Sequence, residues 1–418
     1  MLVDFLLFAA TLAGVALFHR HTLAAALIGL SVITLKKLLG TGFNEGPGLA
    51  GLYAHYAHEW VLISNLFLLL IGFALLARHF ENSRVPDWMP VALPHHWTGG
   101  LVLLVLVFFI SSFLDNIAAA LIGATVSRHV FKGQVRVGYL AAIVAASNAG
   151  GAGSVIGDTT TTMLWIAGVS PLQVLHAYVG AVCALLVSGI PASLAQQKYA
   201  PIAKHAPPNL HISYRYVAVV LIVLGSAIAA NVGAHLFDVE ILDQIPLIGL
   251  AVTTALLLTA PIARPDWSIL PHTARSALFL ISLVSAASMM PVKSLPPASW
   301  ETTLGLGFVS AVFDNIPLTA LAINQGNYDW GFLAYAVGFG GSMIWFGSSA
   351  GVAVAGLMTE ARSTGRWLKE GWPVALGYVL GFFVLLVVMG WNPEVPHRQT
   401  VGSGEPDGFT VAAQPMEP

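Results

Sequence analysis

Apolar stretches that are long enough, or almost long enough, to cross a membrane recur along the whole chain. A fold can keep all of them away from water only if part of its surface faces a lipid bilayer. The clearest stretches are 2–18, 23–39, 60–77, 172–195, 214–236, 244–263, 271–290 and 372–391. Hydrophobic residues make up 56% of the 418 residues and charged residues only 9%, whereas soluble domains have roughly 25% charged residues. We therefore expect an integral membrane protein. The first stretch has no basic leader and no small-residue cleavage site, which indicates a retained helix and not a signal peptide.

Two other apolar regions, 99–130 and 298–325, carry an acid beside an amide at their centres, namely Asp115-Asn116 and Asp314-Asn315. Ionisable groups inside apolar segments are candidates for a functional site by default. Each region is too long for one ordinary span. Two arms of about 15 residues, rising 1.5 Å per residue, suit a re-entrant hairpin with the acidic motif at its tip. One long tilted helix is the alternative interpretation.

Glycines and small hydroxyl residues interrupt two further apolar segments, 137–169 and 329–359. A glycine inside a helix costs about 1 kcal/mol relative to alanine, so a run of them does not propagate a helix cheaply. We predict a broken helix in each segment. The alternative use of these glycines is close helix packing, for which Gly347 and Gly351 have the spacing of a GxxxG pair.

The two regions with an Asp-Asn pair and the two glycine-interrupted segments indicate that the chain arose by duplication of one unit. Tyr178-Val179 recurs as Tyr378-Val379 at matching places in the two halves, and the polar segment 196–213 separates them. Each half contains five crossings and one hairpin, and an odd number of crossings places the halves in opposite orientations. The predicted fold is an all-α, inverted-repeat membrane transporter with about ten transmembrane helices, two re-entrant hairpins and two broken helices. The predicted parts are a first repeat at 1–195, a cytoplasmic linker at 196–213, a second repeat at 214–391 and a disordered tail at 392–418.

The distribution of Lys and Arg predicts the orientation, because cytoplasmic loops carry most of these residues. The basic loops fall on one side at 19–22, 78–98, 128–136, 196–215, 264–275 and 361–369. That side is expected to be cytoplasmic, which places both termini outside. The hairpin with Asp115 then enters from the cytoplasm and the hairpin with Asp314 from the opposite face. The net charge of −2 gives no basic excess for nucleic acid, and the single Cys183 excludes an internal disulfide framework.

A dehydrated cation needs a shell of oxygen atoms, which a hairpin tip and the carbonyls freed by a helix break can supply together. The predicted first site contains Asp115, Asn116, Ser147, Asn148, Gly151, Asp158 and Thr159, and the second contains Asp314, Asn315, Ser342, Ser348 and Ser349. The metal ligands expected for Na⁺ are Asp115, Asn116, Asn148, Asp158, Asp314 and Asn315. The structural alternative is that each Asp-Asn pair, and Asp158 likewise, caps the helix that follows it.

Two other motifs carry weaker signals. His55, His58 and Glu59 lie at helical spacing before a span and could sense pH or hold a metal, but such residues are more often anchors at the membrane interface. Gly151-Ala152-Gly153 superficially matches a dinucleotide-binding loop, but no strand precedes it, so that interpretation fails.

The two Asp-Asn pairs, the run from Ser147 to Thr160 and the run from Gly347 to Val352 resemble the ion transporter superfamily, and most closely its NhaD-type sodium/proton antiporters. The resemblance extends over about residues 55–391. It implies two inverted five-helix repeats, hairpins that enter from opposite faces, a place in the plasma (inner) membrane and often a homodimer. Relatives that carry dicarboxylates have Ser-Asn-Thr at the hairpin tips, whereas both tips here have Asp in place of Ser, which argues against transport of a dianion.

The predicted function is Na⁺/H⁺ antiport by alternating access. Desolvation favours the protonated form of a carboxylic acid and a bound cation favours the carboxylate, so a proton and Na⁺ compete for the same group. Asp115 and Asp314 are the expected exchanging carboxylates, with Asp158 in support; Na⁺ or Li⁺ is the transported ion, and no cofactor is expected. The alternative on the same fold is Na⁺-coupled symport of a small anion or neutral solute. An intramembrane aspartyl protease needs Gly-x-Gly-Asp, but Val155 replaces the first glycine, so we do not expect an enzyme.

Overall fold

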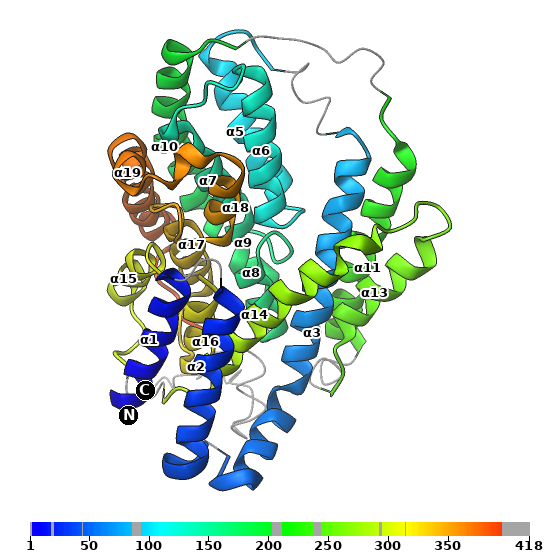
Figure 1. Cartoon of the computed structure of the whole chain (residues 1–418), viewed down its shortest axis with the longest axis vertical. Coiled ribbons are helices and arrows are strands. Elements are labelled where there is room, and N and C mark those ends of the chain that lie inside the picture. The colour runs from blue at the N-terminus through cyan, green and yellow to red at the C-terminus, as the bar shows by residue number, and fades with distance from the viewer. Residues whose placement is uncertain are drawn as a thin grey trace, which may run out of the picture.

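The computed structural model of the chain describes residues 2–17, 21–43, 45–85, 93–202, 211–237, 244–291, 295–313 and 315–394. Within these ranges every long regular element is a helix, and no β-strand occurs (Figure 1). The helical segments with the length and apolar composition to cross a membrane are Thr22–Thr41, Gly48–Asn82, Pro171–Tyr199, Trp267–Ser288 and Thr364–Met389. Shorter apolar helices accompany them. The predicted all-α class is therefore confirmed, and these apolar helices are compatible with a membrane protein.

The helices of the first half follow the predicted apolar stretches closely. They are α1 (Leu2–Leu17), α2 (Thr22–Lys36) with the π-helical turn η1 (Lys37–Thr41), α3 (Gly48–Asn82), α5 (Trp97–Ser111), α6 (Asn116–Val130), α7 (Val137–Ala152), α8 (Thr159–Ile166), α9 (Pro171–Leu175) and α10 (Ala177–Tyr199). The region 99–130 thus forms two helices of similar length joined by a short turn, and α5 and α6 pack against each other.

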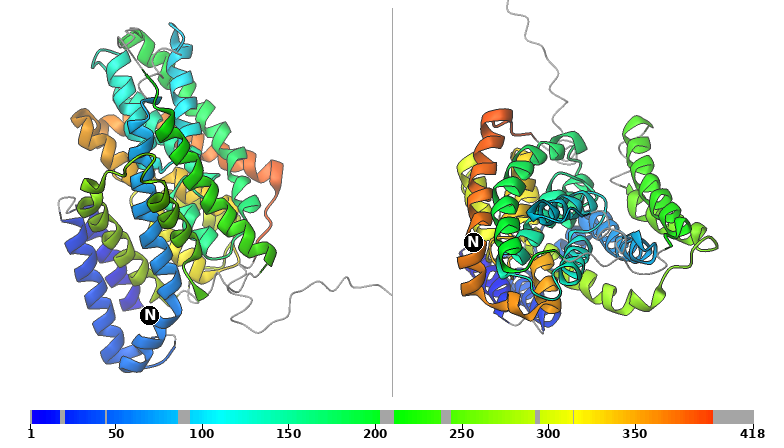
Figure 2. Two further views of the ribbon diagram at one scale, coloured as in Figure 1. Left: turned by 90° about the vertical axis from the view of Figure 1, so that its right-hand side faces the viewer. Right: turned by 90° about the horizontal axis from the view of Figure 1, so that it is seen from above.

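The second half has the same order of elements. They are α11 (Tyr214–Phe237), α13 (Leu247–Thr259), the 3₁₀ turn η2 (Trp267–Ile269), α14 (Leu270–Ser288), α15 (Trp300–Ser310), α16 (Asn315–Gln325), α17 (Trp330–Gly340), α18 (Ser349–Leu357), the 3₁₀ turn η4 (Thr359–Arg362) and α19 (Thr364–Met389). Figure 2 shows α11 and α13 standing to one side of the bundle, where they pack on α3. The helices α10 and α19, which follow the two broken segments, pack along each other.

The long helix α3 extends well beyond the span predicted at 60–77. It begins at Gly48 and ends at Asn82, which corresponds to a length of about 52 Å. Half of the residues from Gly48 to Glu59 are the good helix formers Ala, Leu and Glu, and no proline or Asn-Gly pair lies among them to stop the helix. The expected boundary at residue 60 therefore reflected a change in polarity and not a change in backbone structure.

Polar contacts join α3 to α14 near both ends of the pair. At one end Arg78 Nε donates to Asp266 Oδ2 at 3.1 Å, directly before η2. At the other end His55 Nε2 and Ser288 Oγ are hydrogen-bonded at 3.0 Å, in a buried setting. The two helices also pack against each other.

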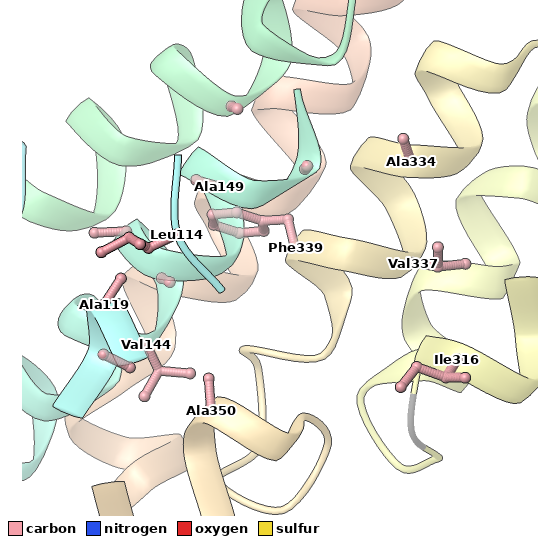
Figure 3. Close-up of a cluster of buried hydrophobic side chains, with 14 of the residues drawn as sticks. Leu114, Ala119, Val144, Ala149, Ile316, Ala334, Val337, Phe339 and Ala350 are labelled. Atoms are coloured by element: carbon pink, nitrogen blue, oxygen red, sulfur yellow. The ribbon is translucent and has the colours of Figure 1, made fainter. Parts of the chain in front are cut away.

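Both segments predicted to be broken are interrupted where the glycines cluster. The helix stops after Ala152 and resumes at Thr159, and it stops after Gly340 and resumes at Ser349. The second half-helix, α18, then packs on both α6 and α7 through small side chains such as Ala119, Val144 and Ala350 (Figure 3). Small side chains let the two halves approach closely at the level of the breaks.

Candidate functional site

A cavity of about 440 Å³ lies between the pair α3 and α14 on one side and the starts of α6, α8, α16 and α18 on the other. Most of its wall is apolar, with Leu66, Phe73 and Leu280 among the lining residues. Arg78, Glu81 and His272 line it at one end, where the Arg78 side chain is 46% exposed. The polar residues at the buried end are Asp115, Asn116, Asp158, Thr159, Asn315 and Ser349. The cavity thus leads from an exposed charged mouth to a cluster of buried oxygen atoms.

The turn between α5 and α6 places the first acid at this cavity. Asp115 occupies the N-cap position of α6 and is half-buried. Ser112 Oγ lies 3.1 Å from both the Phe108 and Gly150 carbonyl oxygens, so a hydroxyl of the turn is tied to the end of α7. The carboxylate is therefore presented by a turn that packs on the first broken helix.

Asn148 joins the first turn to the second broken helix. Its Oδ1 accepts from Asn116 Nδ2 at 3.1 Å, and its Nδ2 donates to Ser342 Oγ at 2.9 Å and to Ser348 Oγ at 3.1 Å. The Asn148 side chain is completely buried. Ser147, its neighbour, donates its hydroxyl to the Asn116 carbonyl oxygen. Residues assigned to two separate predicted shells are therefore linked by direct hydrogen bonds.

Asp158 makes the corresponding link from the first broken helix to the second half. Its Oδ2 accepts from Asn315 Nδ2 at 3.2 Å and from Thr160 Oγ1 at 2.8 Å. Its side chain is 3% exposed, and its Oδ2 lies 3.7 Å from the position that a Cβ on Gly338 would occupy. A Cβ at position 338 would therefore make only an ordinary van der Waals contact with this carboxylate.

Each break depends on a glycine that lies against the backbone of the preceding turn. A Cβ on Gly157 would lie 2.2 Å from the Ser111 carbonyl oxygen, and a Cβ on Gly347 would lie 2.4 Å from the Ala311 carbonyl oxygen. Real Cβ atoms essentially never come closer than 3.0 Å to such an atom. The two breaks therefore meet their neighbouring turns in the same way, although their sequences differ.

Hydroxyl groups bind the carbonyl groups that the first break releases. Thr161 Oγ1 donates to Ser154 O at 2.6 Å and lies 3.4 Å from Gly151 O, while Thr162 Oγ1 lies 3.0 Å from Val155 O. Gly151, one of the predicted site residues, takes part in this network through its backbone carbonyl oxygen. Freed carbonyl groups at helix ends need such partners when they are buried.

The structure brings most of the predicted site residues together, but their roles as ion ligands remain proposals. Asp314 lies outside the described residues, so the contacts given above for the candidate site do not include it. The threonines at 160, 161 and 162 were not among the predicted site residues. Their signal in the sequence was the run of four threonines after Asp158, at the start of a helix where hydroxyl groups can bind backbone groups.

The histidine cluster lies away from the cavity. His55 is 2% exposed, and its Nδ1 lies 3.2 Å from both carboxylate oxygens of Glu45. In the described part of the chain, no group of three or more His, Cys, Asp or Glu residues is arranged to hold a metal ion. His55 therefore serves as a buried partner of Glu45 and Ser288 in this structure.

No protein-family model matches the chain. Among curated proteins it is similar to Sodium/proton antiporter 1 of Arabidopsis thaliana, with 28% identity over 381 residues, which is 81% of this chain and 64% of that protein. Sodium/proton antiporter 2 of the same plant is 29% identical over 283 residues, 59% of this chain and 66% of that protein. The Na(+)/H(+) antiporter NhaD of Halomonas elongata is 28% identical over 386 residues, 78% of this chain and 75% of that protein. The chain thus spans slightly less than two thirds of each plant relative.

Proposed function

We propose, from the confirmed resemblance of this chain to NhaD-type sodium/proton antiporters, that it is a membrane transporter, not an enzyme, and that it exchanges Na⁺ for H⁺ by alternating access. One observation supports this most directly. Residues from both hairpin turns and from both broken helices, Asp115, Asp158, Asn315 and Ser349, line the buried end of one cavity. That arrangement supplies the oxygen atoms and the titratable groups that a competing cation and proton require.

The proposed chemistry is competition for the carboxylates at the inner end of the cavity, where Asp115 is half-buried and Asp158 is buried. Asp115 and Asp158 border the cavity, so either can take up a proton or contact an entering cation. Asn116, Thr159 and Asn315 add neutral oxygen atoms near them. Hard cations such as Na⁺ and Li⁺ prefer an oxygen shell of this kind. Asp314, which precedes Asn315, is proposed as the second exchanging carboxylate, and Asp158 as a supporting ligand of the first site.

The proposal includes an inverted repeat with two re-entrant hairpins. The similar contacts of Gly157 and Gly347 with the turns before them support this, because a duplicated unit is expected to repeat its closest backbone approach. The turn that carries Asp115 is proposed to enter from the cytoplasm and the turn before Asn315 from the opposite face. Both termini would then lie outside the plasma membrane, and assembly as a homodimer is expected from the resemblance.

The test is Na⁺-driven proton movement in proteoliposomes that contain the full chain and a pH-sensitive dye. Asp115→Asn, Asp158→Asn and Asp314→Asn should each lower the initial rate at least about tenfold, since removing one charged ligand of a buried site costs more than about 1.4 kcal/mol. Glu301→Gln, an exposed acid in the first turn of α15, is the matched control and should keep the wild-type rate. Wild-type, pH-dependent exchange in either Asp115→Asn or Asp314→Asn would refute the mechanism.

The size and apolar wall of the cavity favour one second candidate. About 440 Å³ falls within the range of small-molecule sites and exceeds what a single dehydrated ion needs. Na⁺-coupled symport of a small anion or neutral solute would use the same oxygen atoms. The same proteoliposomes distinguish the two functions, because symport requires a solute for Na⁺ flux whereas antiport requires only the opposing proton gradient.

A further inference from the structure

A second cavity, of about 250 Å³, lies where the start of α7, the last part of α10 and the start of α19 meet. None of its lining residues lines the cavity of the proposed ion site. Two prolines inside helices, Pro191 of α10 and Pro373 of α19, border it. A proline removes one intrahelical hydrogen bond and tends to bend its helix, so the walls of this groove include two points where a helix can depart from straight geometry.

The rim of this groove carries positive charge that is not neutralised. Glu370 accepts from Arg136 Nε at 3.4 Å, from the Gly138 N–H at 3.3 Å and from Arg366 at 3.3 Å, so its carboxylate is already shared among several donors. Arg136 uses only Nε for this contact, and its two Nη groups have no hydrogen bond within the described residues. Lys369 is exposed and forms no ion pair in the same part of the chain. The groove therefore presents an ammonium and half of a guanidinium group to an anion.

An apolar strip continues from the groove along α19. Trp372 lines the groove and is 59% exposed, and Leu376 and Leu380 follow at intervals of one helical turn with 40% and 42% exposure. Residues at i and i+4 lie on the same face of a helix, so these three side chains form one continuous apolar track. A soluble anion would not use such a track, whereas a lipid acyl chain would.

We infer that this groove binds an anionic phospholipid, with the phosphate between Arg136 and Lys369 and an acyl chain along Trp372, Leu376 and Leu380. Anionic headgroups are attracted to basic residues at the cytoplasmic surface, and tryptophan is favoured at the same level of the membrane. The loops beside the groove, 128–136 and 361–369, belong to the side predicted to be cytoplasmic. The site is independent of which ion the chain transports.

Native mass spectrometry of the full chain in detergent tests this inference. Phosphatidylglycerol and phosphatidylcholine with the same acyl chains are added separately, and we expect phosphatidylglycerol to stay bound at several-fold higher occupancy. Lys369→Gln should lower that occupancy, and Lys369→Gln combined with Arg136→Gln should reduce it to the level of phosphatidylcholine. Arg275→Gln, an exposed arginine on α14 outside the groove, is the control and should bind like the wild type.

Three kinds of result would overturn the inference. The first is equal retention of the two lipids, or phosphatidylglycerol binding that survives both substitutions in a protein that remains folded. The second is displacement of the lipid by inorganic phosphate alone, which would indicate a site for a free anion. The third is efficient cross-linking between chains through Trp372→Cys in the presence of the lipid, which would assign the groove to a second copy of the chain.

Discussion

Replacing Asn148 with alanine should destabilise the protein because this one amide connects three elements. Asn148→Ala removes the hydrogen bond from Asn116 and the two hydrogen bonds to Ser342 and Ser348, at 2.9 to 3.1 Å. All four side chains are at most 4% exposed, so water cannot replace the lost partner without entering the core.

The expected magnitude follows from the number of hydrogen bonds. Side-chain hydrogen bonds inside membrane proteins average about 0.6 kcal/mol each, which gives about 2 kcal/mol for three. The polar groups left without a partner add to this, because an unsatisfied buried group costs about 1–3 kcal/mol in soluble proteins. We therefore expect Asn148→Ala to lower the free energy of unfolding by about 2–4 kcal/mol.

The assay is reversible unfolding of the purified chain in mixed micelles. Ser193→Ala is the matched control, since Ser193 Oγ is buried and has no hydrogen-bond partner in the described part of the chain. Its removal should change the free energy of unfolding by less than about 0.5 kcal/mol. If Asn148→Ala were as mild as Ser193→Ala, the proposed bridge between the two halves would contribute nothing, and the geometric reasoning would be wrong.

Two further predictions concern the break and the mouth of the cavity. Gly157→Ala places a Cβ 2.2 Å from the Ser111 carbonyl oxygen at the end of α5, so it should lower the free energy of unfolding by about 1–3 kcal/mol and slow transport. Gly305→Ala is the control, because the space around Gly305 is open, and it should leave the free energy of unfolding unchanged or raise it by up to about 1 kcal/mol. Equal free energies of unfolding for the two variants would contradict this prediction. The hydrogen bond from Ser268 and the Arg78 guanidinium lower the pKa of Asp266 below its ordinary 3.8. The ionised Asp266 therefore stabilises the folded chain fully above pH 3.8, and this contribution is lost as the pH falls through the lowered pKa. The free energy of unfolding of Asp266→Asn should be lower than that of the wild type at pH 7 and equal to it at strongly acidic pH. Unfolding measured across this pH range checks the prediction.

Local features of the sequence predicted the helices and their interruptions well. Apolar runs and glycine clusters act over a few residues, so their effects can be read without knowing the rest of the structure. The interruption after Ala152 and the one after Gly340 both fall within the predicted segments. The continuity of α3 through residue 60 was not predicted, because a polar face does not end a helix when no residue breaks its backbone.

The partners of the candidate site residues could not be read from the sequence. Asn148 was grouped with Asn116, but it also binds Ser342 and Ser348, and Asp158 binds Asn315 from the other half. Such contacts depend on how two distant segments pack, and periodicity within one segment carries no information about that.

The two polar contacts between α3 and α14 restrict how the large cavity can change shape. Because Arg78–Asp266 and His55–Ser288 hold the pair near both ends, the two helices resist sliding or splaying relative to each other. A movement that closes the exposed mouth and keeps both contacts would carry α3 and α14 together relative to the helix starts around Asp115 and Asp158. Such a movement would change the apolar contacts that line the cavity beside the carboxylates and would break neither of these two hydrogen bonds.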